Sequence, residues 1–485
     1  MTDVRASSAD PPVFFSDPLT LLSAFILAGS LVLFVWMQLA VPRLDRLDDP
    51  AHALDLMVSR SLDLEEALRA APPWERTLVE FGTGDDTEAL TQAIDWYEEL
   101  ATAAPSPETD LRLAILEAED GRLARVQDRV IVWRGFTEPY PAYADVIERA
   151  YLPRPPTAPS PESDGSSGEP GTAPVGSSVG LPEGWFADRL GLAVAVQNGD
   201  RADERLLRAR LASRGTVLLE RARALAFAQG AVLLLGLLVL ARVLAAARSA
   251  DRDMTTVVSL APWTGRAGAV VLLRGGAAGA VITIALLLWE ADNLLLRLLA
   301  VPLTNAPLLW LAQKRLVQPS GRTFAQALGL APVQSVWASI VAMALAVSAA
   351  SLGGEWLMGQ AAEAVRASSH WTEWFDPDLA WGGPALLGVS LVDYALLAPA
   401  FEEVVFRGLL FATLRRRYGF GTAAASSAAV FAALHGYGLL GFVSVWWSGI
   451  LWAWAFERTG SLWPGMLAHA ANNALVCVGV LALLR

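Results

Sequence analysis

Long apolar runs recur along the chain, one near the N-terminus and the others after residue 224. A helix crosses a bilayer with roughly 20 residues, and most of these runs reach that length. Only helices and closed barrels satisfy their backbone hydrogen bonds in lipid, and uninterrupted apolar runs favour helices. The pattern therefore predicts an all-α, polytopic transmembrane helix bundle of about nine spans. The spans are expected at residues 19–41, 225–246, 267–289, 294–312, 334–356, 384–412, 421–436, 438–456 and 463–484.

Between the first and second spans the pattern changes to apolar positions spaced three and four residues apart, as in residues 62–69 and 89–100. This spacing is typical of amphipathic helices and predicts a helical extramembrane domain. The domain boundaries follow from the changes in pattern. They are 1–44 (N-terminal segment and first span), 45–151 (helical domain), 152–184 (a linker rich in Pro, Ser and Gly), 185–224 (amphipathic helical connector), 225–319 (accessory spans) and 320–485 (core).

Composition narrows the class of protein further. The chain is 54% hydrophobic, with a mean hydropathy of +0.40, which excludes an ordinary soluble globule. Its formal net charge of -12 argues against nucleic-acid binding, and Cys477 is its only cysteine, which excludes an intrachain disulfide or a cysteine metal site. Lys314 is the only lysine, a bias towards arginine that indicates a bacterial source.

Arginines flank alternate loops, which predicts the orientation. They follow the second, fourth, sixth and eighth spans, and these loops should be cytoplasmic. The pattern predicts a multi-pass protein of the bacterial inner (plasma) membrane with residues 45–222 outside the cytoplasm. The lipid bilayer is then one partner, and residues 45–151 are expected to bind a second, protein partner.

Three ionisable residues interrupt the sixth span: Glu402, Glu403 and Arg407. Each costs about 2.5–3.5 kcal/mol to insert into a bilayer, so such residues are rarely incidental. Glu403 and Arg407 are four residues apart on a helix and can form an ion pair. Glu402 points to another sector, and a carboxylate in a poorly solvated site can act as a general base near neutral pH.

Two histidines occur in equally apolar surroundings. His435 follows Phe431 by one helical turn, and His469 precedes Asn473 by one turn on the last span. An imidazole and a carboxamide on one helical face can stabilise a developing oxyanion. With Glu402 they supply what hydrolysis of an amide by an activated water requires. Asp393, in the same span as Glu402, is interpreted as structural or cavity-lining.

The motifs Ala-Pro-Ala-Phe-Glu-Glu-Val-Val-Phe-Arg-Gly-Leu-Leu (398–410), Phe-x-x-x-His (431–435) and Gly-Ser-Leu-Trp-Pro-Gly-Met-Leu-Ala-His-Ala-Ala-Asn-Asn (460–473) resemble the CPBP intramembrane protease family. That family comprises CAAX prenyl endopeptidases and bacteriocin-processing (Abi-type) relatives, and the resemblance covers residues 320–485. It implies a catalytic Glu402, supported by Glu403 and Arg407, and a water bound or oriented by His435. It also implies an oxyanion site at His469 and Asn473, and a membrane-associated peptide or protein substrate.

The residues leave three questions open. Glu402, His435 and His469 would suit a divalent metal such as zinc, but the chain has no His-Glu-x-x-His helix, so direct water activation is favoured. A non-catalytic membrane scaffold, held together by a structural polar cluster, is the main alternative to a protease. A proton-coupled transporter would also explain intramembrane carboxylates, although inverted repeats are not recognisable.

Overall fold

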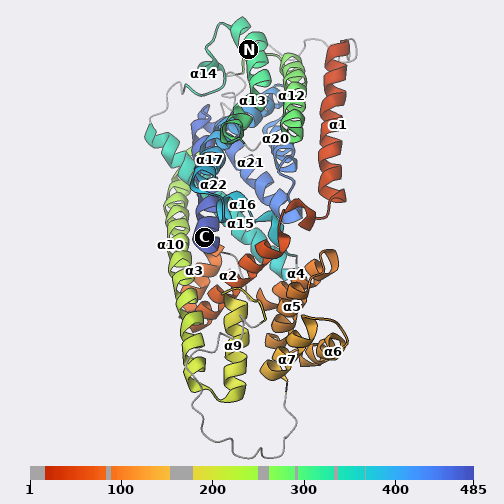
Figure 1. The fold of residues 1–485 in the computed structure, drawn as a ribbon. Coiled ribbons are helices and arrows are strands. Elements are labelled where there is room, and N and C mark those ends of the chain that lie inside the picture. The colour runs from red at the N-terminus through yellow and green to blue at the C-terminus, as the bar shows by residue number, and fades with distance from the viewer. Residues whose placement is uncertain are drawn as a thin grey trace, which may run out of the picture. The chain divides into compact units, whose positions relative to one another are not determined.

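The computed structural model describes residues 17–83, 89–152, 179–249, 261–289, 293–331, 337–365 and 367–485. Within these residues every regular element is a helix and none is a strand, which confirms the predicted all-α fold (Figure 1). The chain divides into two compact units, the first made of Met1–Val41 with Ala228–Val480 and the second of Pro42–Phe227 with Leu481–Arg485. The predicted linker, residues 152–184, falls mostly on residues 153–178, outside the described part of the chain.

Eight helices in the described ranges are long and apolar enough to cross a membrane. Their bounds are Pro18–Gln38, Arg201–Ala245, Gly265–Leu288, Leu294–Ser320, Trp337–Ala364, Pro384–Arg415, Leu439–Thr459 and Trp463–Leu484. The ninth predicted span, at residues 421–436, corresponds to the shorter apolar helix Phe420–Ala433. The polytopic bundle expected from the apolar pattern is therefore present.

The elements of the first unit are helices of very different lengths. They are α1 (Pro18–Ala40), the later part of α10 (Arg201–Ser249), α12 (Gly265–Leu288), α13 (Leu294–Ala312), η3 (Gln313–Val317), η4 (Gln318–Ser320), α14 (Phe324–Ala327), α15 (Trp337–Ala364), η5 (Trp371–Glu373), α16 (Pro377–Ala380), α17 (Pro384–Val392), η6 (Asp393–Leu397), α18 (Ala398–Glu402), η7 (Glu403–Phe411), α19 (Ala412–Arg415), α20 (Phe420–Ala433), α21 (Leu439–Thr459) and α22 (Trp463–Leu484).

The span Pro384–Arg415 is a continuous helix that contains two π-helical segments, η6 and η7, and we call it the broken span. Proline has no N–H to donate, and its ring clashes with the carbonyl four residues earlier. For Pro399 that carbonyl belongs to Ala395, in the middle of η6. The wider turn therefore occurs where the proline excludes a regular α-helical bond. Single π-helical turns frequently mark functional sites.

Buried apolar side chains join this span to its neighbours. Leu409 and Phe411 of η7 are fully buried in a core cluster with Leu316 of η3 and Phe456 of α21. Close packing of these buried side chains fixes the rotation of the helix about its axis. The residues of η7 that face away from this cluster are therefore held in a defined direction.

The second unit consists of shorter helices. They are η2 (Leu44–Arg46), α2 (Pro50–Ala70), α3 (Pro73–Thr83), α4 (Ala89–Ala103), α5 (Pro107–Glu119), α6 (Leu123–Trp133), α7 (Tyr140–Tyr151), α9 (Trp185–Asn198) and the first part of α10. Leu64 of α2, Val79 of α3 and Leu218 of α10 belong to one buried cluster. The part of α10 before Phe227 thus packs with the helical domain, in the region where the sequence predicted an amphipathic connector.

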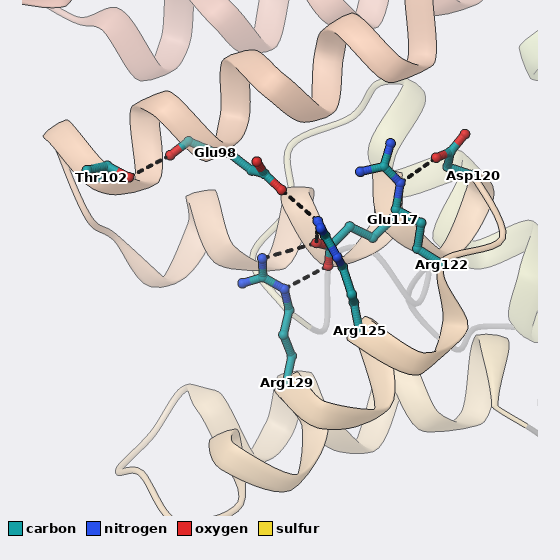
Figure 2. A network of polar contacts seen from close by, with 7 residues as sticks. All are labelled: Glu98, Thr102, Glu117, Asp120, Arg122, Arg125 and Arg129. Carbon is teal, nitrogen blue, oxygen red and sulfur yellow. Dashed lines mark hydrogen bonds and ion pairs between the residues drawn. The ribbon is translucent and has the colours of Figure 1, made fainter.

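A buried carboxylate organises one side of this unit (Figure 2). The Glu117 side chain is 1% exposed, and its two oxygens accept hydrogen bonds from Nε and Nη2 of Arg129 at 2.7 and 3.2 Å. Arg125 lies between Glu117, at 3.8 Å, and Glu98, at 2.9 Å. These contacts join α4, α5 and α6, so the network sets how the three helices pack.

Replacing Arg129 with alanine should therefore destabilise the second unit. The change leaves Glu117 with only the distant Arg125, and we expect a loss of about 1–3 kcal/mol, below the cost of stranding a fully buried charge because Arg129 is 28% exposed. Hydrogen exchange of the α5 and α6 amides in the full-length protein measures it. As a control, Arg134→Ala removes an exposed pair with Glu148, and a loss equal to that of Arg129→Ala would contradict the role of burial.

Candidate active site

The two adjacent glutamates of the broken span lie in different environments. The Glu402 side chain is 30% exposed, whereas that of Glu403 is 1% exposed. Successive side chains on a helix point in directions about 100° apart, so neighbouring residues reach different surroundings. Glu402 is consequently the carboxylate that an incoming molecule can reach.

Glu403 forms the ion pair that the sequence predicted. Nη1 of Arg407 donates to Oε1 of Glu403 at 2.8 Å, and both side chains are 1% exposed. The guanidinium also lies over the ring of Phe431, at 4.4 Å from its centroid, and near that of Trp452, at 5.0 Å. Aromatic faces attract a desolvated cation by about 2 kcal/mol, which helps to offset the burial of Arg407.

His469 of α22 lies between the two glutamates. Its Nδ1 is 3.2 Å from Oε1 of Glu403, and its Nε2 is 3.6 Å from Oε2 of Glu402. The ionised carboxylate of Glu403 can only accept a hydrogen bond, so Nδ1 carries the proton, and Nε2 of the neutral ring then faces Glu402 as an acceptor. The imidazole thus connects the exposed carboxylate to the buried ion pair.

An indole holds the plane of the imidazole. Trp452 of α21 stacks on His469 with ring centroids 4.1 Å apart and an interplanar angle of 20°, and Phe431 meets His469 edge-on at 5.7 Å. Trp452 is one of 18 tryptophans in the chain and lies outside the three sequence motifs. The sequence spacing between Trp452 and the motif residues does not predict the stacking, because the two rings lie on different helices.

The second predicted imidazole contacts the same phenylalanine. His435 lies two residues beyond the end of α20, its Nδ1 is 2.9 Å from the carbonyl oxygen of Phe431, and the two rings are 4.6 Å apart. A carbonyl only accepts, so Nδ1 donates and Nε2 is the acceptor of this ring. Both histidines therefore contact Phe431, and His469 also lies 3.6 Å from Glu402.

Asn473 is hydrogen-bonded to the backbone of the broken span, and its oxyanion role stays a prediction. Its Nδ2 donates to the carbonyl oxygen of Tyr394 in η6 at 2.9 Å, and the Tyr394 hydroxyl donates to Oδ2 of Asp376 at 2.9 Å. Its side chain thus supports a carbonyl of a π-helical turn, where the regular helical bonding is altered. Asp393, in the same turn, has a buried Oδ1 without a hydrogen-bond partner.

The predicted metal ligands do not converge on one point. No group of three or more His, Cys, Asp or Glu side chains within the described ranges is arranged to hold a metal ion. Glu402, His435 and His469 therefore do not form a ready-made set of ligands, although the Nδ1 contacts of both histidines leave Nε2 as the nitrogen that would bind a metal.

The approach of α22 to Glu403 depends on a residue without a side chain. A Cβ at Gly465 would lie 2.8 Å from Oε2 of Glu403 and 3.5 Å from Cβ of Trp452. Gly465→Ala should therefore displace the buried carboxylate or the helix and destabilise the fold by about 1–3 kcal/mol.

Thermal unfolding in detergent tests this change against a glycine in open surroundings. Gly353 of α15 would place no atom within 4 Å of a new Cβ, and its replacement by alanine should be neutral or mildly stabilising. Equal effects of the two substitutions would show that the contact with Glu403 is not tight.

One known family matches the part of the chain that contains the candidate site. A family model described as type II CAAX prenyl endopeptidase Rce1-like matches residues 384–475, from the start of α17 into α22. Residues 384–475 are therefore similar to an Rce1-like domain, which confirms the predicted resemblance to the CPBP proteases over this part of residues 320–485 and, at a coarse level, supports a CAAX-type intramembrane protease. No curated protein and no solved structure gives a significant match to the chain.

Proposed function

We propose that the chain is an intramembrane endopeptidase that hydrolyses a peptide bond of a membrane-proximal protein or peptide. One observation carries the proposal: the accessible carboxylate, Glu402, faces an imidazole whose opposite nitrogen contacts a buried ion pair. An exposed base, an oriented imidazole and an apolar surrounding are the parts that hydrolysis by activated water requires.

Glu402 is the general base in this proposal. A water held between its Oε2 and Nε2 of His469 gives a proton to the carboxylate as its oxygen attacks the carbonyl carbon of the scissile bond. The carbonyl oxygen becomes an oxyanion. When the C–N bond breaks, the proton passes from Glu402 to the leaving amine, so the carboxylate is regenerated.

His469 and His435 orient the water, and His469 can also stabilise the developing oxyanion. In the neutral tautomers described above, Nε2 of each ring accepts a hydrogen bond from water. A His469 that has taken a proton from solvent before the attack would donate from Nε2 to the developing oxyanion while Nδ1 still donates to Glu403, and Glu402 and His435 would then hold the water. Asn473 has two amide N–H groups, one of which is bonded to Tyr394, so the second is its contribution to the same oxyanion.

The Glu403–Arg407 pair acts through His469 and not on the substrate. A fixed negative charge beside Nδ1 selects the tautomer and favours the imidazolium when it forms. The arginine balances that charge, so the pair adds little net field to the apolar interior. Glu403 and Arg407 are therefore positioning residues in this proposal.

The chain's substrate is proposed only as a class. The matched family is named for CAAX prenyl endopeptidases, and processing of a leader peptide, a bacteriocin or an envelope protein is the alternative within the same chemistry. The helical domain at residues 45–151 would recruit or restrain this substrate.

The test is identification of the cleaved bonds. The purified protein and its Glu402→Gln variant are incubated with a digest of membrane-associated proteins, and new termini are identified by mass spectrometry. Termini produced by the unchanged protein alone support the proposal, and a lack of difference between the two overturns it. Repeating the assay with a chelator separates the two chemistries, because direct water activation predicts unchanged cleavage.

A further inference from the structure

Polar side chains also occur at an interface that the proposed reaction does not use. α15 and α21 are both long enough to span, and each carries two polar residues four apart, Ser351 with Glu355 and Ser444 with Ser448. Residues at this spacing share one face of a helix. Oγ of Ser444 donates to Oε1 of Glu355 at 3.2 Å, so these two faces meet.

The two helices run antiparallel, which sets the register of the four residues. Glu355 contacts Ser444, whereas the earlier Ala350 accepts a hydrogen bond at its carbonyl from the later Trp447, at 3.0 Å. Moving four residues back along α15 and four forward along α21 brings Ser351 level with Ser448. The same step again brings Val347 level with Trp452, and these two residues do share a core cluster.

The two serines at the middle level are buried and unsatisfied. Ser351 and Ser448 are each 3% exposed, and their hydroxyl oxygens make no hydrogen bond of standard geometry. A helical serine can bond to the carbonyl four residues earlier, and neither of these does so. The Ser448 hydroxyl also approaches the Glu355 carboxylate, whereas Ser351 has no such neighbour. Buried hydroxyls are nearly always bonded to protein or to water, so water is the remaining partner of Ser351 and can complete the bonding of Ser448.

Unsatisfied polar atoms continue from this level towards the candidate active site. Nε1 of Trp452, one turn beyond Ser448, is buried and makes no hydrogen bond, and its ring stacks on His469. Nη2 of Arg407 lies 2.9 Å from where a Cβ on Gly449 would be, and both Nε and Nη2 of Arg407 lack partners. The series thus begins at Glu355 and ends at the ion pair beside His469.

We infer that these atoms line a water path, in which a file of water molecules enters between α15 and α21 at Glu355 and Ser444. The path passes Ser351 and Ser448 and ends at Arg407. Water suits this series, because each buried donor or acceptor gains a partner at a modest entropic cost. The path's role in catalysis rests on the proposed function: hydrolysis consumes one water for each bond cleaved, and a bound substrate that covers the exposed side of Glu402 would otherwise block the entry of water.

Thiol accessibility tests the path without any reference to catalysis. In a Cys477→Ala background, Ser448→Cys introduces a thiol on the path, and Ala453→Cys introduces one that is similarly buried on another face of the same helix, within a separate apolar cluster. A small charged methanethiosulfonate should modify the first variant at least tenfold faster than the second. Equal, slow modification of both would overturn the path.

Turnover tests whether the path supplies the reaction. Valine and threonine have nearly the same volume, so Ser448→Val and Ser448→Thr differ only in the hydroxyl at this level. The valine variant should lower kcat several-fold with KM unchanged, and the threonine variant should retain kcat. Equal turnover by the two overturns the supply role, whereas no cleavage even by the unchanged protein counts against the proposed protease and leaves the accessibility result standing.

Discussion

Glu402→Gln is expected to lower peptide-bond cleavage by at least ~100-fold while the protein stays folded, since a positioned general base contributes about 10²–10⁴-fold. Glutamine keeps the size and a hydrogen-bonding carbonyl, but it cannot take a proton from water. The side chain is 30% exposed, and the buried Arg407 keeps Glu403 as its direct partner, so the change to glutamine should not disturb packing. Initial rates on a peptide identified by mass spectrometry measure the effect.

A glutamate outside the site provides the matched control. Glu363 is exposed near the end of α15, a helix that carries none of the candidate site residues. Its replacement by glutamine is the same chemical change as Glu402→Gln. Glu363→Gln should cleave at the normal rate. Retained proteolysis by the Glu402 variant would contradict the assignment of the base.

The second large effect concerns stability. Arg407→Ala removes the partner of Glu403, which stays fully buried and hydrogen-bonded only to His469. Leaving one member of a buried pair uncompensated costs about 3–5 kcal/mol. The substitution also removes the cation that lies over Phe431 and Trp452. Thermal unfolding in detergent should therefore shift strongly to lower temperature, and activity should fall as His469 loses its fixed neighbour.

Comparing these variants separates the protease from a scaffold. If the polar cluster only held helices together, Glu402→Gln would lower thermal stability as much as Arg407→Ala, and no peptide would be cleaved. The catalytic reading predicts an unfolding temperature for Glu402→Gln close to that of the unchanged protein. Arg315→Ala, which removes an exposed arginine in η3, controls for the loss of a positive charge. A transporter would instead show proton-linked uptake in vesicles.

Local patterns along the chain were sufficient to predict the class of fold. Eight of the expected spans are helices long enough to cross a membrane, because a helix in lipid must satisfy its backbone within a single continuous segment. The Glu403–Arg407 pair was also predictable from local spacing, because side chains four residues apart on one helix lie close together. The π-helical turn at η6 also has a local cause, in Pro399, although its position was not anticipated.

Contacts between helices could not be read in this way. The sequence alone supports an apolar, helical, multi-span chain with carboxylates and imidazoles at membrane depth. The tertiary structure decided which carboxylate stays accessible, that Trp452 stacks on His469, and that Asn473 bonds to Tyr394. These contacts depend on the rotation and register of helices far apart in the chain. Rotation and register follow from the packing of whole surfaces, which no short pattern of residues specifies.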